Sequence, residues 1–481
     1  MVVVGGGLTG LTAALVLRHH GLDVAVVEKH RGTSPQPKAR RFQVSTMEVF
    51  RELGLANRVA DAARELSPHH RMSSGRTLAE SAWLPAPAWL TGDVPEISPE
   101  QPVLVAQDVL EPVLRAAAVE AGADVRFGTR AGIPRQDTDG VTVPLPDGDL
   151  RAEYVIAADG SRSPIREALG ITRTGAGDLG DRIVNVYFRA DLTELLRGRE
   201  FNLCTIEHPD APGTIASIGA GRWLLMTTAR DADWPAYLRT ALGVPAPELE
   251  LLSVMEWQPE MRVAERFADG RVFLAGDAAH VMPPWAAAGA NTGIADVANL
   301  GWKLAAVLRA EAAPELLDSY DAERRPVATL VAEESVRRMR GTGEVHPFVL
   351  ATGGLQYPLP GVTEPEPVTE FAPAGRVGVR VPHAWLPDGR STLDLVGPGW
   401  ALLVAGDGEW PSDVPVHRVD VPWLADGEAV LVRPDRVVAW RGARASCYPR
   451  EIFNASVGQA VAAARACARS AGGTGPSIMI G

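Results

Sequence analysis

The distribution of apolar positions begins with a strand, a helix and a second strand within the first 27 residues. Residues 1–4 form a short apolar run, Leu8–His19 has apolar residues at helical spacing, and residues 23–27 are rich in β-branched side chains. Short apolar runs of this kind are typical of strands that are buried on both faces. The pattern therefore predicts a βαβ unit at the start of the chain.

The α/β pattern continues but is interrupted once. Residues 46–63 read as helix with a break at Gly54, and 66–100 read as irregular because Pro, Ser and Trp are frequent. Between 180 and 262, short alternating segments predict antiparallel strands with one covered face. The other predicted elements are a helix at 109–120, strands at 124–128, 141–144, 154–158 and 271–275, and helices at 292–310 and from Pro326 to 339.

A third region follows a segment rich in Gly, Pro and Thr at 341–372. Strand patterns at 401–404, 416–419 and 430–432 and a helical pattern at 458–469 predict a small separate α/β domain at 373–481. The predicted organisation is a discontinuous dinucleotide-binding domain (1–65, 100–179 and 263–340), an inserted substrate-binding region (66–99 and 180–262), a linker (341–372) and this C-terminal domain. The predicted fold class is α/β.

Composition excludes several functional classes. The 47 basic residues are outnumbered by 59 acidic ones, which gives a net charge of −12 and argues against nucleic-acid binding. No run of 18 apolar residues suggests a membrane span. The three cysteines are far apart with no CxxC pair, which argues against a disulfide framework and a zinc site. The start of the chain lacks a signal-peptide pattern, so we expect a cytoplasmic protein.

A glycine motif lies at the first strand-to-helix turn. Gly5, Gly7 and Gly10 satisfy GxGxxG, and Glu28 follows Gly10 by 18 residues at the end of the next predicted strand. Such glycines allow a tight turn in which the helix N-terminus faces a pyrophosphate, and an acid at about this spacing binds ribose hydroxyls. The motif predicts a dinucleotide site but does not separate FAD from NAD.

Two further acidic motifs follow predicted parallel strands. Asp159-Gly160 comes after the strand at 154–158, and Asp277 lies in the GDAAH segment after the strand at 271–275. An acid directly after a parallel strand lies at the carboxyl edge of the sheet, where ligands bind. The segment 283–292 then leads into the long helix, with Asn291 or Thr292 as the expected N-cap.

These three motifs, in this order, resemble the single-component FAD-dependent aromatic hydroxylases, a group that includes para-hydroxybenzoate hydroxylase. The segment VFLAGDAAHVMPPWAAAGANTGIADVANLGWKLAAVL is very similar to the polyketide-tailoring branch, which includes the tetracenomycin and anthracycline hydroxylases. The resemblance covers nearly the whole chain. It implies a Rossmann-like FAD-binding domain, an inserted antiparallel sheet for the substrate, and a C-terminal thioredoxin-like domain. Because that domain lacks CxxC, we expect no redox chemistry there.

The resemblance also implies roles for individual residues. Gly5, Gly7 and Gly10 would hold the FAD pyrophosphate and Glu28 the adenosine ribose. Leu8, Thr9 and Lys29 are further candidate cofactor-binding residues. Arg40 and Gln107 would contact the flavin nucleotide from the side. Asp277 would bind the ribityl or pyrophosphate part, and Asp159 would support binding of both FAD and NAD(P)H. Pro284, Gly289, Ala290 and Asn291 would line the isoalloxazine ring.

Two departures from the family pattern stand out. Ala286, Ala287, Ala288 and Ala290 occupy a loop that is Gly-rich in the family, which predicts a stiffer loop. Lys38 and Ser45 stand where the family has arginines. We therefore do not expect these two positions to make the phosphate or NADPH contacts that are usual in the family.

The implied activity is NAD(P)H- and O2-dependent hydroxylation of a polycyclic aromatic polyketide through a flavin C4a-hydroperoxide. Either NADPH or NADH would be the reductant, and the protein would be a monomer or a homodimer. A Baeyer–Villiger or ring-rearranging oxygenase on the same scaffold is one alternative. A flavin- or aromatic-ligand-binding protein without oxygenase activity is another.

Candidates for the substrate pocket and for catalysis are less specific. Trp223, Met226 and Trp285 are candidate wall residues and Trp83 and Trp89 candidate lid residues, although core packing explains each equally well. Tyr187, His69 and His70 are candidate bases for a phenolic substrate. His280 follows the GD pair, and we expect it to support the loop rather than to take part in chemistry.

Overall fold

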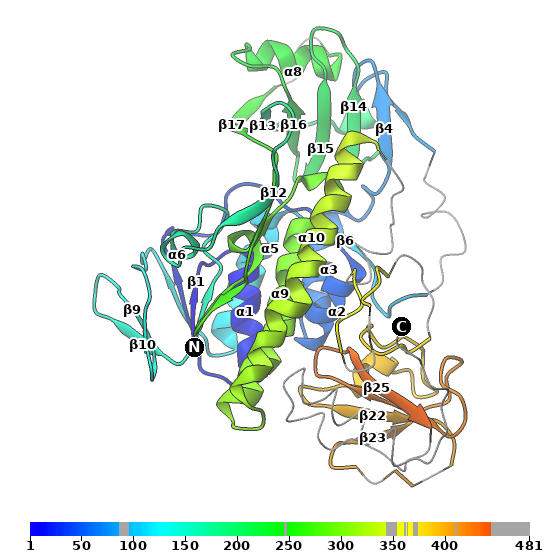
Figure 1. Ribbon diagram of the computed structural model, residues 1–481. Coiled ribbons are helices and arrows are strands. Elements are labelled where there is room, and N and C mark those ends of the chain that lie inside the picture. Colours follow the sequence, from blue (N-terminus) through cyan, green and yellow to red (C-terminus); the bar gives the residue numbers. More distant parts are fainter. Residues whose placement is uncertain are drawn as a thin grey trace, which may run out of the picture.

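The computed structural model describes residues 1–85, 96–244, 248–342, 354–359, 362, 364–368, 374–407, 409–410 and 412–443. Three bodies of structure are visible in Figure 1: an α/β layer at the N-terminus, a large sheet above it, and a small sheet domain that follows in sequence. Two long helices, α9 (Ala288–Leu308) and α10 (Asp318–Arg340), lie beside each other between these bodies.

The N-terminal layer is a six-stranded sheet in the order β19-β20-β11-β1-β2-β7. Five strands are parallel, and β19 is an antiparallel edge. Its central strands are buried along their whole length because helices cover both faces. The bounds are β1 (Val2–Val4), β2 (Ala25–Glu28), β7 (Asp124–Phe127), β11 (Val155–Ala157), β19 (Ala268–Asp269) and β20 (Val272–Leu274).

Helices around this sheet follow the predicted pattern with two differences. Helix α1 (Leu8–His19) packs against α5 (Gln107–Glu120) and α9. The break at Gly54 separates α2 (Val44–Glu52) from α3 (Ala56–Ala63), as predicted. However, α9 begins four residues before the predicted start, and α10 begins eight residues before Pro326, which it contains. Pro326 removes one helical hydrogen bond and crowds the carbonyl of the preceding turn, but the tertiary contacts of α10 outweigh this local cost.

The large sheet has seven strands in the order β17-β13-β16-β15-β14-β4-β5. It is antiparallel except for the parallel pair β4 and β14, so the inserted sheet is mixed rather than purely antiparallel. One face packs against α7 (Thr193–Leu196) and α8 (Trp234–Leu242). The bounds are β4 (Met72–Gly75), β5 (Ala82–Trp83), β13 (Ile183–Arg189), β14 (Leu203–Ile206), β15 (Gly213–Gly219), β16 (Arg222–Thr227) and β17 (Glu250–Trp257).

Smaller sheets complete this part of the chain. A three-stranded sheet of β12 (Arg173–Asp178), β18 (Glu260–Ala264) and β21 (His280–Val281) links the large sheet to the N-terminal layer. A second is formed by β8 (Arg135–Asp137), β9 (Gly140–Val143) and β10 (Leu150–Ala152), and β3 (Arg41–Phe42) pairs with β6 (Val103–Leu104). The helix α6 (Pro164–Ala168) follows the Asp159-Gly160 segment.

The C-terminal domain contains a four-stranded mixed sheet around its own apolar core. Its strands are β22 (Ala401–Val404), β23 (Val416–Arg418), β24 (Glu428–Val432) and β25 (Val438–Ala443). The helix predicted at 458–469 lies outside the described residues. Within the described ranges, no helix combines the length and apolarity needed to cross a lipid bilayer.

Candidate active site

The glycine motif forms a turn in which two backbone segments approach closely. Gly5 has φ +113°, and a Cβ placed on it would lie 2.1 Å from the carbonyl oxygen of Ala158. A Cβ on Gly10 would lie 1.9 Å from the carbonyl oxygen of Gly5. Helix α1 starts at Leu8 with Gly7 as its N-cap and no side-chain cap, so its first N–H groups have no capping side chain. These groups fit a pyrophosphate.

Two buried carboxylates hold this turn. Glu28 accepts hydrogen bonds from the backbone N–H of Gly6 (2.7 Å) and of His30 (2.8 Å). Glu111, on α5, accepts from the backbone N–H of Ser34 (2.7 Å) and from the Gln107 amide (2.6 Å). Burial raises the pKa of Glu111. Sequence reasoning missed Glu111, and the only local signal was Gln107 one helical turn before it.

The turn residues Thr9 and Lys29 have different surroundings. Cβ atoms on Gly276 or Gly293 would lie 2.5 Å from Oγ1 of Thr9, so α1, the loop after β20, and α9 meet at this side chain. Lys29 is exposed directly after β2, and Leu8 is buried beneath the turn. The predicted contacts of Glu28 and Lys29 with an adenosine ribose stay predictions.

Arg40 and Gln107 both contact other parts of the protein. The Arg40 guanidinium donates to the carbonyl of Ser217 and to Oδ1 of Asn202 (2.8 Å), and burial lowers its pKa to about 10. Gln107 accepts from the backbone N–H of Ala39 at 3.2 Å. Arg40 therefore joins the FAD-binding layer to the large sheet, and its contact with the flavin nucleotide stays a prediction.

Asp159 and Asp277 lie at the carboxyl ends of the neighbouring strands β11 and β20. Oδ2 of Asp159 accepts from the backbone N–H of Ile165 at 3.3 Å, whereas Oδ1 is buried without a hydrogen-bond partner. Asp277 is accessible on the surface, and desolvation by the protein around it raises its pKa. Both groups are suited to accept hydrogen bonds from ligand hydroxyls.

The loop before α9 is constrained at both ends. Ala287 has φ +51°, a left-handed conformation that costs a non-glycine residue about 1 kcal/mol, and it precedes the first residue of α9. The prediction of Asn291 or Thr292 as N-cap is therefore wrong, since both lie inside the helix. Instead, Oδ1 of Asn291 accepts from Thr46 Oγ1 (2.6 Å) and from the backbone N–H of Gln43 (2.9 Å).

The rest of this loop is less tightly packed than the turn at Gly293. It contains Pro284, Gly289 and Ala290, which were predicted to line the flavin. Pro284 starts the 3-10 turn Pro284–Ala286. A Cβ on Gly289 would meet only the Met282 side chain, at 3.9 Å, whereas one on Gly293 would clash with Thr9. Space therefore remains along the first turn of α9, where the amides of Gly289 and Ala290 belong to the uncapped helix start.

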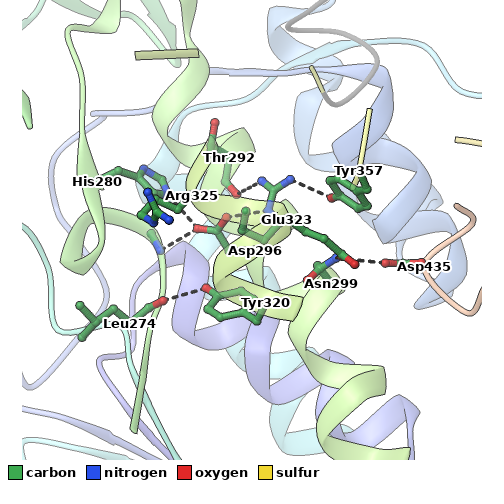
Figure 2. Close-up of polar contacts among 12 residues, drawn as sticks. Leu274, His280, Thr292, Asp296, Asn299, Tyr320, Glu323, Arg325, Tyr357 and Asp435 are labelled. Atoms are coloured by element: carbon green, nitrogen blue, oxygen red, sulfur yellow. Dashed lines mark hydrogen bonds and ion pairs between the residues drawn. The ribbon is translucent and has the colours of Figure 1, made fainter. Parts of the chain in front are cut away.

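His280 is part of a buried polar network rather than of an open site. Its Nε2 lies 2.7 Å from Oδ2 of Asp296, and both side chains are fully buried. The same carboxylate accepts from the backbone N–H of Gly276 (3.1 Å) and from Nε of Arg324 (2.9 Å). Figure 2 shows Asp296 at the centre of these contacts. The surroundings of His280 agree with the expected supporting role.

The face of the large sheet opposite α7 and α8 carries a row of side chains from neighbouring strands. Asn185 of β13 lies opposite both Met226 of β16 and Met255 of β17, and Met226 lies opposite Thr214 of β15. Met255 is 41% exposed, and the other three are partly buried. We name Met255, Asn185, Met226 and Thr214 the Met–Asn row.

Trp223 does not belong to this face. Because side chains alternate along a strand, Trp223 and Met226 point to opposite faces of β16. Trp223 packs against Phe201, with ring centroids 5.7 Å apart, and its indole N–H donates to the carbonyl of Ala190 at 3.0 Å. Trp223 is therefore a core residue beneath α8, and we no longer count it among the candidate wall residues of the substrate pocket. Met226 and Trp285 remain candidates.

Tyr187 lies on the same face as the Met–Asn row and forms a polar cluster. Arg222 donates to the Tyr187 hydroxyl at 3.0 Å and to Oδ2 of Asp108 at 2.5 Å. The Tyr187 hydroxyl is 3.4 Å from the same carboxylate oxygen, and the other oxygen of Asp108 is buried without a partner. Burial raises the pKa of Tyr187, so this phenol stays protonated.

The remaining candidates lie outside this cluster. His69 contacts the carbonyl of Phe201 at 3.3 Å, and burial lowers its pKa, while His70 is exposed. Trp285 is 45% exposed on the loop before α9. Trp83 is exposed, and its indole donates to the carbonyl of Glu200 at 3.1 Å. Trp89 lies outside the described residues.

Comparisons with known proteins agree with this geometry. The FAD binding domain family model matches residues 1–335, and the aromatic-ring hydroxylase C-terminal model matches residues 374–464. Tetracenomycin B2 monooxygenase-dioxygenase of Streptomyces olivaceus is 37% identical, over 94% of this chain and 97% of that protein. Aklavinone 12-hydroxylase of Streptomyces peucetius is 37% identical, over 86% of this chain and 93% of that protein.

A solved structure gives the same result. The chain superposes on aklavinone-11 hydroxylase, solved as a ternary complex with FAD and aklavinone, with a TM-score of 0.81 and 32% identity over 97% of this chain and 98% of that one. The predicted α/β fold class, FAD as cofactor and the monooxygenase activity are therefore confirmed, and NAD(P)H is the reductant typical of this class. The chain belongs to the FAD-dependent aromatic-ring hydroxylases, in the branch that contains the polyketide hydroxylases.

Proposed function

We propose that this enzyme hydroxylates a polycyclic aromatic phenol or quinone of polyketide origin, using O2. The observation that supports this most directly is the Met–Asn row, where Met226 and Met255 flank a single amide, Asn185, on one sheet face. Flexible thioether side chains adapt to flat apolar surfaces. The Asn185 amide, whose oxygen accepts from the Trp257 indole at 3.0 Å, would use its N–H groups to orient a ring system that carries few hydroxyl or carbonyl groups.

The cofactor site is proposed on the residues described above. Gly5, Gly7 and Gly10 would leave room for the FAD pyrophosphate at the start of α1, and Asp159 and Asp277, at the carboxyl ends of β11 and β20, would accept from ligand hydroxyls. The loop from Pro284 to Asn291 would lie against the flavin ring. When bound and reduced, FAD supplies the activation of O2 and the transfer of one oxygen atom to an electron-rich ring.

Tyr187 is the favoured residue for handling a substrate proton. It lies on the same face as the Met–Asn row, and Arg222 and Asp108 fix its hydroxyl. The single O–H of Tyr187 points to Oδ2 of Asp108 at 3.4 Å, so it would donate to a substrate oxygen by exchanging that long contact while Arg222 still donates to the hydroxyl. His69 and His70 have no comparable arrangement, so we do not retain them.

A second outcome on the same scaffold is favoured by one specific comparison. The relative from Streptomyces olivaceus is named both a monooxygenase and a dioxygenase. A Baeyer–Villiger or ring-rearranging product therefore stays the alternative. A non-oxygenating binding protein is the remaining alternative, motivated by the alanines at 286–290 and by Lys38 and Ser45.

Oxidation of NADPH or NADH by the purified holoprotein tests the proposal. Aklavinone, tetracenomycin-type naphthacenes and simple monocyclic phenols would be compared as substrates. We expect the polycyclic compounds to stimulate oxidation and the monocyclic phenols to have little effect. Met226→Trp should reduce this stimulation, while Trp223→Phe, which changes only the far face, should not. The absence of stimulation by any polycyclic compound would favour the binding protein. The oligomeric state, monomer or homodimer, is read from the same preparation by light scattering.

A further inference from the structure

A buried polar chain connects the loop that carries Asp277 to the C-terminal domain. It begins at Asp296, which accepts from the backbone N–H of Gly276 at 3.1 Å and from Nε of Arg324 at 2.9 Å. Gly276 directly precedes Asp277, and its φ of +60° brings it against Thr9. The position of the Asp277 backbone therefore depends on Asp296.

Arg324 extends this chain away from the loop. Its Nη1 donates to the hydroxyl of Tyr357 at 3.0 Å, and its Nη2 to the carbonyl of Thr292 at 3.3 Å (Figure 2). Thr292 lies in the first two turns of α9, beside the loop proposed to face the flavin. Arg324 thus holds two positions of α9, Thr292 and Asp296, and it reaches the Asp277 loop only through Asp296, which accepts from Gly276. Tyr357 fixes the other end of its guanidinium.

Tyr357 belongs structurally to the C-terminal part of the protein. Its backbone N–H donates to the carbonyl of Gly378 at 2.8 Å, and the N–H of Gly378 donates to Val438 of β25 at 2.8 Å. The ring packs in an apolar cluster with Val437 of the C-terminal domain, Val327 and Val331 of α10, and Ala288 at the start of α9. Met282, in the loop between β21 and α9, packs against the same cluster.

A second set of buried charges holds the C-terminal domain against α9 and α10. Glu323 accepts from Arg433 at 2.7 Å and 2.8 Å and from Lys303 at 2.8 Å. Arg433 also pairs with Asp435, whose carboxylate accepts from Asn299 at 3.2 Å. Glu323 and Arg324 are adjacent in α10. The same turn of this helix therefore holds the C-terminal domain through Glu323 and contacts Asp296 through Arg324.

We propose that Tyr357 is a positioning residue for FAD, and that the C-terminal domain acts through it to fix the Asp277 loop and the start of α9. In this account the domain, which has no CxxC pair, contributes to cofactor retention instead of redox chemistry. Loss of the Tyr357 hydroxyl leaves a buried Arg324 donor without its partner, which loosens the link to Asp296 and Thr292.

The test compares Tyr357→Phe with Tyr237→Phe by titrating FAD into apoprotein. Tyr237 is a matched control, because its buried hydroxyl bonds to Pro212 and Thr227 in the large-sheet region. We expect the FAD dissociation constant to rise about threefold to tenfold in Tyr357→Phe, the range that one lost hydrogen bond gives, and to stay unchanged in Tyr237→Phe. The visible absorbance of the bound flavin should shift only in Tyr357→Phe.

A second pair of variants avoids charged groups. Val437→Ala shortens a C-terminal side chain that packs on Tyr357, whereas Val419→Ala does the same within the core of that domain. Both should lower the melting temperature, but only Val437→Ala should weaken FAD binding. Equal FAD affinities within both pairs would overturn the proposal. Since FAD titration needs no substrate, this outcome is independent of the substrate class proposed above.

Discussion

Asn185 of β13 lies directly opposite Met226 of β16, on the face of the large sheet that also carries Tyr187. This pairing places one amide among flexible apolar side chains and within the same surface as the Tyr187–Arg222–Asp108 cluster. In the proposed function, this sheet face would hold a flat aromatic ring and present the Asn185 N–H groups as donors to its oxygens.

Gly10→Ala should abolish FAD binding. The added methyl group would lie 1.9 Å from the carbonyl oxygen of Gly5, so the turn at the pyrophosphate site must move. Gly32→Ala is the matched control, because its Cβ would meet nothing within 4 Å. We expect the Gly32 variant to be purified yellow and the Gly10 variant colourless. A yellow Gly10→Ala protein with unchanged affinity would contradict the assignment of this turn.

Asp277→Ala should weaken FAD binding by about tenfold or more, because one charge-assisted hydrogen bond is worth about 1.5–3 kcal/mol. The control is Asp147→Ala, at an exposed turn between β9 and β10. Fluorescence titration of the apoproteins measures both constants. Equal affinities in the two variants would remove Asp277 from the cofactor site.

Tyr187→Phe should lower kcat by about tenfold or more and change KM less, because the lost hydroxyl handles charge during the reaction rather than the bulk of substrate contact. Burial raises the pKa of Tyr187, so the wild-type donor stays protonated across the working pH range. Steady-state kinetics with aklavinone, beside the Tyr237→Phe control, give both constants. A fall in kcat of the same size in both variants would mean that Tyr187 acts only through stability.

The stability of the protein should decrease in acid because of His20. Burial lowers the pKa of His20 from 6.5 to about 4. Between these two pH values His20 is protonated in the unfolded chain but not in the folded chain. Stability is therefore lost as the pH falls from about 6.5 to about 4, by roughly 3 kcal/mol from this group. Urea unfolding at pH 7 and pH 4.5 should show a smaller difference for His20→Gln than for the wild type. An equal difference would contradict the assignment.

Much of the fold was predictable because its signals are local. A few neighbouring residues are enough to predict the apolar strands β1 and β2, the glycine turn between β1 and α1, and the helix break at Gly54. The start of α9 was missed because Ala287 adopts a left-handed conformation that glycine usually adopts, and an alanine does not predict it. Trp223 was misplaced although strand alternation alone separates it from Met226.

The buried polar chain could not be predicted from sequence. Its members come from separate segments of the sequence: Asp296, Arg324 and Tyr357. Polar residues of these types are usually found at the surface, and only the packing of the helices brings these three together. The same holds for the contact between Glu111 and Ser34, which are 77 residues apart in the sequence. Long-range pairing of charges depends on tertiary structure, which no local pattern encodes.

The most direct test of the central claim is the fate of labelled oxygen. The holoprotein would be supplied with NADPH, a polycyclic phenol such as aklavinone, and ¹⁸O2, and the product would be examined by mass spectrometry. The account predicts a product that carries one ¹⁸O atom on an intact ring system, with no label incorporated from H2¹⁸O in the reciprocal experiment. A product without the label, or recovery of unchanged phenol despite consumption of NADPH across the substrate panel, would contradict it.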